Sequence, residues 1–280
     1  MTESILTPFL ESVKITAFVL VMMILVDLLN VWTQGKLSIL LQKGRRWKQY
    51  IVASFLGATP GCFGAFAGVS LYVHGMLSFG ALTGMMVATA GDAQFIMLAM
   101  FPETALLIFG ILFVVGIFTG VITDFIVKKY RITICTDCEA IQFHKNESGF
   151  LHYFKEHIWK HIIKKHIWKT FLWVFGALLV LEFGLKFWDI EAITSEYVLL
   201  LLLASAVIGL IPESGPHIIF VTMFAQGLIP FSVLLTSSIV QDGHGMLPLL
   251  SYSVKDSIKV KVFNLGFGVI IGLLFYMLGY

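Results

Sequence analysis

Apolar stretches long enough to cross a lipid bilayer follow one another along this 280-residue chain. An α-helix needs about 20 apolar residues to span the hydrocarbon core, and four runs approach this length: residues 15–32, 104–127, 170–188 and 262–280. Hydrophobic residues make up 58% of the chain and charged residues only 13%, against roughly 45–50% and about 25% in soluble domains. The sequence therefore predicts an all-α polytopic membrane protein and excludes a soluble domain, a coiled coil and a disordered chain.

Four further apolar stretches are interrupted near their centres by glycine and proline. They cover residues 49–73, 76–100, 197–226 and 228–252. Proline removes a helical hydrogen bond and glycine permits non-helical backbone, so each interruption predicts a helix that unwinds near mid-membrane. The residues at the breaks are Thr59-Pro60-Gly61, Gly91-Asp92, Pro212-Glu213-Ser214-Gly215-Pro216 and Gln241-Asp242-Gly243-His244-Gly245.

The breaks recur at a constant spacing of 152 residues. Pairs aligned at this offset include Gly57 with Gly209, Pro60 with Pro212, Gly75 with Gly227, Gly91 with Gly243, Gly116 with Gly268, and Gly120 with Gly272. This pattern predicts an internal duplication, with a first transmembrane repeat over residues 12–127, a linker over 128–169 and a second repeat over 170–280. Broken helices at matching positions of two halves are typical of transporter binding sites.

The distribution of charge predicts that the two repeats are inverted in the membrane. All but two of the 19 Lys and Arg residues lie in three segments, 36–48, 128–169 and 255–261. Such an excess marks cytoplasmic segments, whereas the acidic connections at 101–103 and 189–196 are expected outside. The first helices of the two halves then cross in opposite directions. Residue 48 is expected inside and residue 103 outside, so the two apolar stretches between them must together cross the membrane an odd number of times. One of the two is therefore expected to cross and the other to form a re-entrant hairpin. The expected hairpin tips are Pro60 and, in the second half, Pro212.

The linker over residues 128–169 is basic and contains five of the eight histidines. Between His157 and Lys169, isoleucine and tryptophan are interspersed with lysine, which predicts an amphipathic helix at the cytoplasmic surface of the membrane. Cys135-x-x-Cys138 and the His157/His161 pair leave open a role in metal sensing. Because the cytoplasm is reducing, no structural disulfide is expected.

The polar residues at the breaks form the candidate substrate site. Non-helical backbone at membrane depth is tolerated only where protein or a watery cavity surrounds it, so the four breaks are expected to converge near the midplane. The candidate substrate-binding residues are Thr59, Pro60, Cys62, Asp92, Gln94, Glu213, Ser214, His217, Gln241, Asp242 and His244. Asp27 and Glu182 lie mid-span in the first helix of each half and are candidates for the same region.

The charge of the predicted spans favours a cation as the substrate. They contain several acidic residues, whereas Lys186 is expected to be the only basic residue inside the membrane. Carboxylate and imidazole groups suit Mn²⁺, Fe²⁺ or Zn²⁺, and they can exchange a metal ion for protons. The expected metal ligands are Asp92, Glu213, His217, Asp242 and His244. A structural alternative stays open, in which the two aspartates cap helices and the two histidines bind backbone carbonyls.

Four blocks of sequence resemble the ten-transmembrane heavy-metal exporter family. They are residues 57–66 (GATPGCFGAF), 89–96 (TAGDAQFI), 209–220 (GLIPESGPHIIF) and 241–245 (QDGHG). The resemblance covers nearly the whole chain apart from the linker. It implies a multi-pass transporter of the bacterial inner membrane, similar to proteins labelled manganese transporters or arsenic-efflux-like permeases. His244 departs from the acidic residue that the family pattern implies, and Glu213-Ser214 stands where a Gly-Cys pair is expected.

The sequence thus predicts a secondary transporter that exports a divalent transition-metal ion, with manganese as the first candidate. It has no Walker, dinucleotide-binding or hydrolase motif, so no enzymatic activity and no cofactor beyond the transported ion are expected. Two alternatives stay open: a permease for arsenical or thiol-reactive substrates centred on Cys62, and a non-transporting metal sensor that uses the linker. The expected partners are the lipid bilayer, the metal ion and coupling protons. A homodimer is left open, and nucleic acid is not expected.

Overall fold

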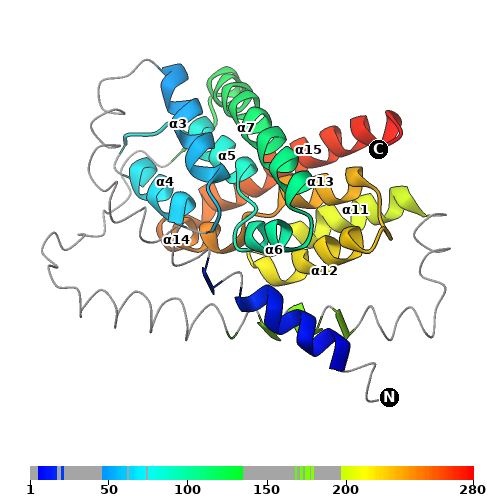
Figure 1. The fold of residues 1–280 in the computed structure, drawn as a ribbon. Coiled ribbons are helices and arrows are strands. Elements are labelled where there is room, and N and C mark those ends of the chain that lie inside the picture. Colours follow the sequence, from blue (N-terminus) through cyan, green and yellow to red (C-terminus); the bar gives the residue numbers. More distant parts are fainter. Residues whose placement is uncertain are drawn as a thin grey trace, which may run out of the picture.

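The structure is a computed structural model. It describes residues 6–17, 20–21, 46–61, 63–73, 75–134, 168, 171–172, 174–176, 178–179 and 197–280. Within these ranges all regular secondary structure is helical and no strand occurs, which confirms the predicted all-α class. Figure 1 shows the helices packed around one another, with α5 and α13 in the interior of the group.

Both predicted breaks of the first half are present. The helices of this half are α3 (Arg46–Ala58), α4 (Phe63–Val73), α5 (Phe79–Ala88), α6 (Ala93–Met100) and α7 (Pro102–Tyr130). Thr59-Pro60-Gly61 separates α3 from α4, and Gly91-Asp92 lies between α5 and α6. Pro102 occupies the first turn of α7, where its missing N–H removes no helical hydrogen bond.

The second half contains α11 (Val198–Gly209), α12 (Ser214–Ala225), α13 (Phe231–Val240), the 3₁₀ turn η2 (Gly243–Gly245), α14 (Met246–Tyr252) and α15 (Val254–Met277). Its first break is shorter than predicted, because α12 already begins at Ser214. Pro216 lies in the first turn of α12, whose N–H groups have no partner within the helix. Helix formation therefore tolerates this proline.

The helix boundaries follow the 152-residue offset found in the sequence. Helix α5 covers residues 79–88 and α13 covers residues 231–240, so α13 begins and ends 152 residues after α5. Helices α7 and α15 begin at residues 102 and 254, with the same shift. The two halves therefore share their local structure, while the inversion of one half relative to the other stays a prediction.

Small residues allow the central helices to approach their neighbours closely. Every residue of α5 is buried, and α5 packs against α3 and α7. A Cβ added at Gly84 would lie 2.2 Å from the Gly116 carbonyl oxygen of α7. In the second half, a Cβ at Gly272 of α15 would lie 1.8 Å from the Thr236 hydroxyl oxygen of α13. Close backbone contact at glycine is a common means of helix association in membranes.

Among the described residues, three helical stretches are long and apolar enough to cross a membrane: Phe79–Met100, Pro102–Tyr130 and Val254–Met277. The most apolar part of the first stretch is 94% buried, against 39% and 22% for the other two. Other helices therefore shield the first stretch, while α7 and α15 present apolar side chains at the surface of the fold. The predicted runs over 15–32 and 170–188 lie mostly outside the described residues.

The two halves contact each other through several helix pairs. Helix α6 packs against α12, α4 packs against α14, and α5 packs against both α13 and α15. Figure 1 shows α6 and α12 side by side. These contacts bring the break before α6 to the beginning of α12.

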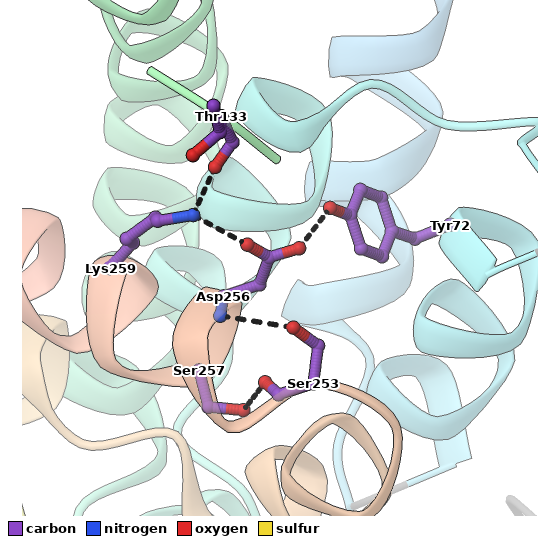
Figure 2. Close-up of polar contacts among 6 residues, drawn as sticks. All are labelled: Tyr72, Thr133, Ser253, Asp256, Ser257 and Lys259. Atoms are coloured by element: carbon purple, nitrogen blue, oxygen red, sulfur yellow. Dashed lines mark hydrogen bonds and ion pairs between the residues drawn. The ribbon is translucent and has the colours of Figure 1, made fainter. Parts of the chain in front are cut away.

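A polar cluster fixes the beginning of α15 against the first half (Figure 2). The Tyr72 hydroxyl of α4 donates a 2.8 Å hydrogen bond to Asp256, which also pairs with Lys259 at 2.9 Å. Lys259 donates in turn to the Thr133 carbonyl that follows α7. Ser253 caps the helix by accepting a hydrogen bond from the Asp256 N–H. The predicted span over 262–280 therefore begins eight residues earlier, at Val254.

Candidate functional site

The breaks of the two halves meet at a pair of glycines. A Cβ built on Gly91, between α5 and α6, would lie 3.2 Å from the Cα of Gly243, between α13 and α14, and the converse distance is the same. Both glycines have positive φ angles, 55° and 53°, a conformation that glycine adopts without steric penalty. The two positions correspond at the 152-residue offset, so equivalent points of the two halves touch.

Both glycine turns are stabilised by the same kind of local hydrogen bond, in which the glycine N–H donates to the side chain two residues earlier. The Thr89 hydroxyl accepts a 3.2 Å hydrogen bond from the Gly91 N–H, and the Gln241 side-chain oxygen accepts a 2.9 Å hydrogen bond from the Gly243 N–H. Thr89 and Gln241 each follow the last residue of the preceding helix. The Gln241 amide nitrogen is buried and has no hydrogen-bond partner among the described residues.

A third break joins this contact through Ser214, the first residue of α12. Its hydroxyl oxygen lies 2.9 Å from the position of a Cβ on Gly91 and 2.8 Å from that of a Cβ on Gly243. Ser214 is only 3% exposed, and its hydroxyl has no hydrogen-bond partner within the described part of the chain. The structure thus brings three of the four predicted breaks together.

The fourth break, Thr59-Pro60-Gly61, lies beside α6. The Gln94 side-chain nitrogen donates a 3.3 Å hydrogen bond to the Ala58 carbonyl at the end of α3. A Cβ on Gly61 would lie 3.1 Å from the ring of Phe95. The Thr59 hydroxyl donates back to the Leu56 carbonyl of its own helix, so in this conformation it stabilises the end of α3.

His217 lies three residues after Ser214 on α12, so the two side chains share a helix face. Its Nδ1 lies 2.6 Å from the Ser237 hydroxyl of α13. Nδ1 therefore bonds a side-chain hydroxyl, and not the backbone carbonyl considered in the structural alternative. Nε2 is buried and has no hydrogen-bond partner among the described residues, and it is available to a ligand.

Asp242 is fully buried and forms an ion pair with Lys261 of α15. The distance between Asp242 Oδ2 and Lys261 Nζ is 2.6 Å, and Asn264 donates a 2.5 Å hydrogen bond to Asp242 Oδ1. Lys261 Nζ also donates to the carbonyl of Gly209, the last residue of α11, at 3.1 Å. Lys261, which was expected in a cytoplasmic segment, thus contacts a predicted site residue, because α15 begins early enough to include it.

Two acidic residues precede helices that begin at the breaks. Asp92 directly precedes α6 and is 4% exposed, while the half-buried Glu213 directly precedes α12. Neither side chain makes a capping hydrogen bond to its helix. The capping alternative considered for Asp92 is therefore not observed.

Several predicted site residues lie outside the described part of the chain. They are Cys62, the side chain of His244, Asp27, Glu182 and the linker from residue 135 to 167. Among the side chains that are described, no three from His, Cys, Asp and Glu lie close enough to hold a metal ion. The five-residue metal set stays a prediction, and His244 is one of its members.

The sequence interpretation missed two polar residues that the structure brings to Asp242. Lys261 and Asn264 continue through Gly268 and Gly272 at spacings of three and four residues, which places all four on one face of α15. Asn264 and the two glycines are buried. The glycines were already marked by the 152-residue offset, so extending their helical period backwards would have placed Lys261 on the buried face.

Comparison with known families finds one match over most of the chain. The model of a family described as "Putative, 10TM heavy-metal exporter" matches residues 3–172 and 153–279. These matches cover nearly the whole chain, so the chain belongs to this family. No curated relative and no solved structure matches the chain.

Proposed function

We propose that the protein is a secondary transporter that exports a divalent transition-metal ion across the bacterial inner membrane, with manganese as the first substrate to test. The observation that supports this most is the convergence of breaks at Gly91, Ser214 and Gly243. Asp92 directly follows the first of these glycines in the chain, Asp242 directly precedes the second, and both aspartates are buried. Two acidic groups beside unwound backbone in a buried position suit a cation.

Buried polar atoms on the residues of the breaks and of the helices that follow them support a polar substrate. Burying a polar group without a partner costs about 1–3 kcal/mol, and such atoms are uncommon in folded proteins. Within the described residues, the buried atoms without a hydrogen-bond partner include Gln94 Oε1, Ser214 Oγ, His217 Nε2 and Gln241 Nε2. A hydrated ion that passes between these side chains would provide their missing partners.

The proposed ligand set combines Asp92, Asp242 and His217 with Glu213 and His244. Divalent ions bound through few protein groups keep part of their water shell, and a transport site must also release its ion. The conformation described here has Asp242 paired with Lys261. The proposal therefore requires that this pair separates when the ion binds. Exchange of the ion for protons is the proposed coupling.

Flux in proteoliposomes tests the proposal. The purified full chain would be reconstituted, and uptake of Mn²⁺, Fe²⁺, Zn²⁺, Co²⁺ and arsenite would be measured separately under an imposed proton gradient. We expect saturable Mn²⁺ flux that the other divalent ions inhibit, and no arsenite flux. Arsenite flux without divalent-ion flux would overturn the proposed substrate class, and no flux of any of the five would overturn the proposal of transport.

A further inference from the structure

The Lys261 ammonium lies in an environment that a bound cation would favour. It contacts the buried Asp242 carboxylate at 2.6 Å and the Gly209 carbonyl at 3.1 Å. Gly209 is the last residue of α11, and the C-terminal end of a helix carries partial negative charge. A carboxylate and a helix-end carbonyl therefore both face the ammonium.

Asn264 positions the carboxylate from the other side. Asn264 is fully buried, and its Nδ2 holds the second oxygen of Asp242 at 2.5 Å. The Asn264 Oδ1 atom is buried and has no hydrogen-bond partner among the described residues. An amide oxygen of this kind is a suitable ligand for a hard cation. The side chain that holds Asp242 thus also carries an oxygen without a hydrogen-bond partner among the described residues.

The first half of the chain shows that this helix packing does not need an ion pair. At the 152-residue offset, Asp242 corresponds to Ala90, Lys261 to Phe109, and Asn264 to Leu112. These three counterparts are all apolar and buried. Since a buried ion pair is weak evidence for stabilisation, the presence of the polar set in one half only indicates a function other than packing.

We infer that Lys261 is a tethered cation that occupies the position of the substrate beside Asp242 when no substrate is bound. The inference rests on the proposed function and deepens it by naming the group with which the ion competes. The ammonium contacts the Asp242 carboxylate at 2.6 Å, and a metal ion on the same carboxylate would be repelled by it at short range. Binding of the ion therefore opposes the Lys261–Asp242 pair. The flexible lysine chain, whose side chain is 13% exposed, allows the ammonium to withdraw.

This competition also gives the site a means of selecting by charge. The attraction of an ion to a carboxylate grows with the charge of the ion. A divalent ion therefore gains about twice the attraction of a monovalent one and displaces the ammonium more readily. Lys261 is accordingly a specificity-determining residue: without it, K⁺ and Na⁺ would face no competing charge at Asp242.

Thermal unfolding of the purified full chain in detergent, with titrated MnCl₂ or KCl, tests the inference. K261M removes the charge and keeps the length of the side chain, while K261R keeps the charge. K259M is the matched control, since Lys259 also pairs with an aspartate of α15. We expect K261M to be less stable than wild type without added ions, and to be stabilised at MnCl₂ concentrations about tenfold lower. KCl should also stabilise K261M, whereas K261R and K259M should resemble wild type in their response to KCl.

Two results would overturn the inference. One is a K261M protein whose Mn²⁺ midpoint and K⁺ response equal those of wild type, which would make the pair purely structural. The other is a K261M response that persists in the K261M/D242N double variant, because the ion would then bind elsewhere. If K261M does not fold, the neutral, polar K261Q replaces it and K261R remains the charge-keeping control. Equal Mn²⁺ midpoints in wild type and K261Q would contradict displacement. Failure of the proposed function is distinguishable, since neither wild type nor any variant would then respond to Mn²⁺.

Discussion

Gly91 and Gly243 touch where the two halves of the chain meet, although 152 residues separate them. Each occupies the same position in its half and has the same left-handed backbone conformation. The Ser214 hydroxyl lies against both. This relationship links the predicted duplication to the proposed substrate site, because the residues that flank the contact are the two aspartates.

Substitution of either glycine should disturb this contact. In G91A or G243A, the new Cβ would meet the Ser214 hydroxyl and the opposite glycine, and the positive φ would add about 1–2 kcal/mol of strain. We expect a lower unfolding temperature and a loss of most Mn²⁺ flux. G75A has positive φ with nothing near its Cβ, and G110A lies in open space on α7. Mn²⁺ flux in G75A and G110A should stay near the wild-type value. A G91A variant whose Mn²⁺ flux equals that of wild type would contradict the account.

The hydrogen bond between Tyr72 and Asp256 should contribute measurably to stability. Y72F removes the donor and leaves one oxygen of a buried carboxylate without that partner. Hydrogen bonds to charged groups contribute about 1.5–3 kcal/mol, so the unfolding temperature should fall. Y130F changes an exposed tyrosine and should leave it unchanged. An unfolding temperature for Y72F equal to that of wild type would show that the cluster in Figure 2 does not hold α15 in place.

Ser237 should act by orienting His217. S237A removes the hydroxyl that lies 2.6 Å from Nδ1, so the ring can rotate away from the site. We expect a higher apparent KM for Mn²⁺ with a smaller change in maximal rate. The neighbouring Ser238 donates to the Leu234 carbonyl of its own helix, so S238A is a matched control. If S237A and S238A gave the same KM as wild type, His217 would have no part in binding.

Cys62 distinguishes the metal from the arsenical alternative. A carboxylate and imidazole site does not use a thiol, whereas a soft, thiol-reactive substrate does. C62S should therefore leave Mn²⁺ flux within about twofold of wild type. Loss of Mn²⁺ flux in this variant, measured at wild-type protein levels in the proteoliposomes, would favour a permease centred on the thiol.

The break positions could be predicted from the sequence because their causes are local. Proline at position 60 ends a helix wherever the chain folds, and glycines such as Gly91 and Gly243 permit left-handed turns. Pro216 was the exception, since a proline in the first turn of a helix removes no hydrogen bond. Its position relative to the start of α12 decided its effect.

The partner of Asp242 could not be read from composition or charge counts. Lys261 lies in a basic segment, and its burial depends on where α15 begins and on how α15 packs against α13. Ser253 and Asp256 set that beginning by a capping bond, and Tyr72 of the other half fixes it in space. The helical period of the α15 glycines indicates which face Lys261 occupies, but which residue it meets there depends on contacts between segments distant in sequence.

The initial rate of Mn²⁺ uptake into proteoliposomes by D92N, compared with wild type, tests the central claim most directly. Asp92 is buried beside the glycine contact, whereas the exposed Glu103 at the start of α7 provides the control variant E103Q. The account predicts that D92N reduces uptake to the level of empty vesicles while E103Q transports at the wild-type rate. Uptake by D92N at the wild-type rate, with equal protein incorporated, would contradict it.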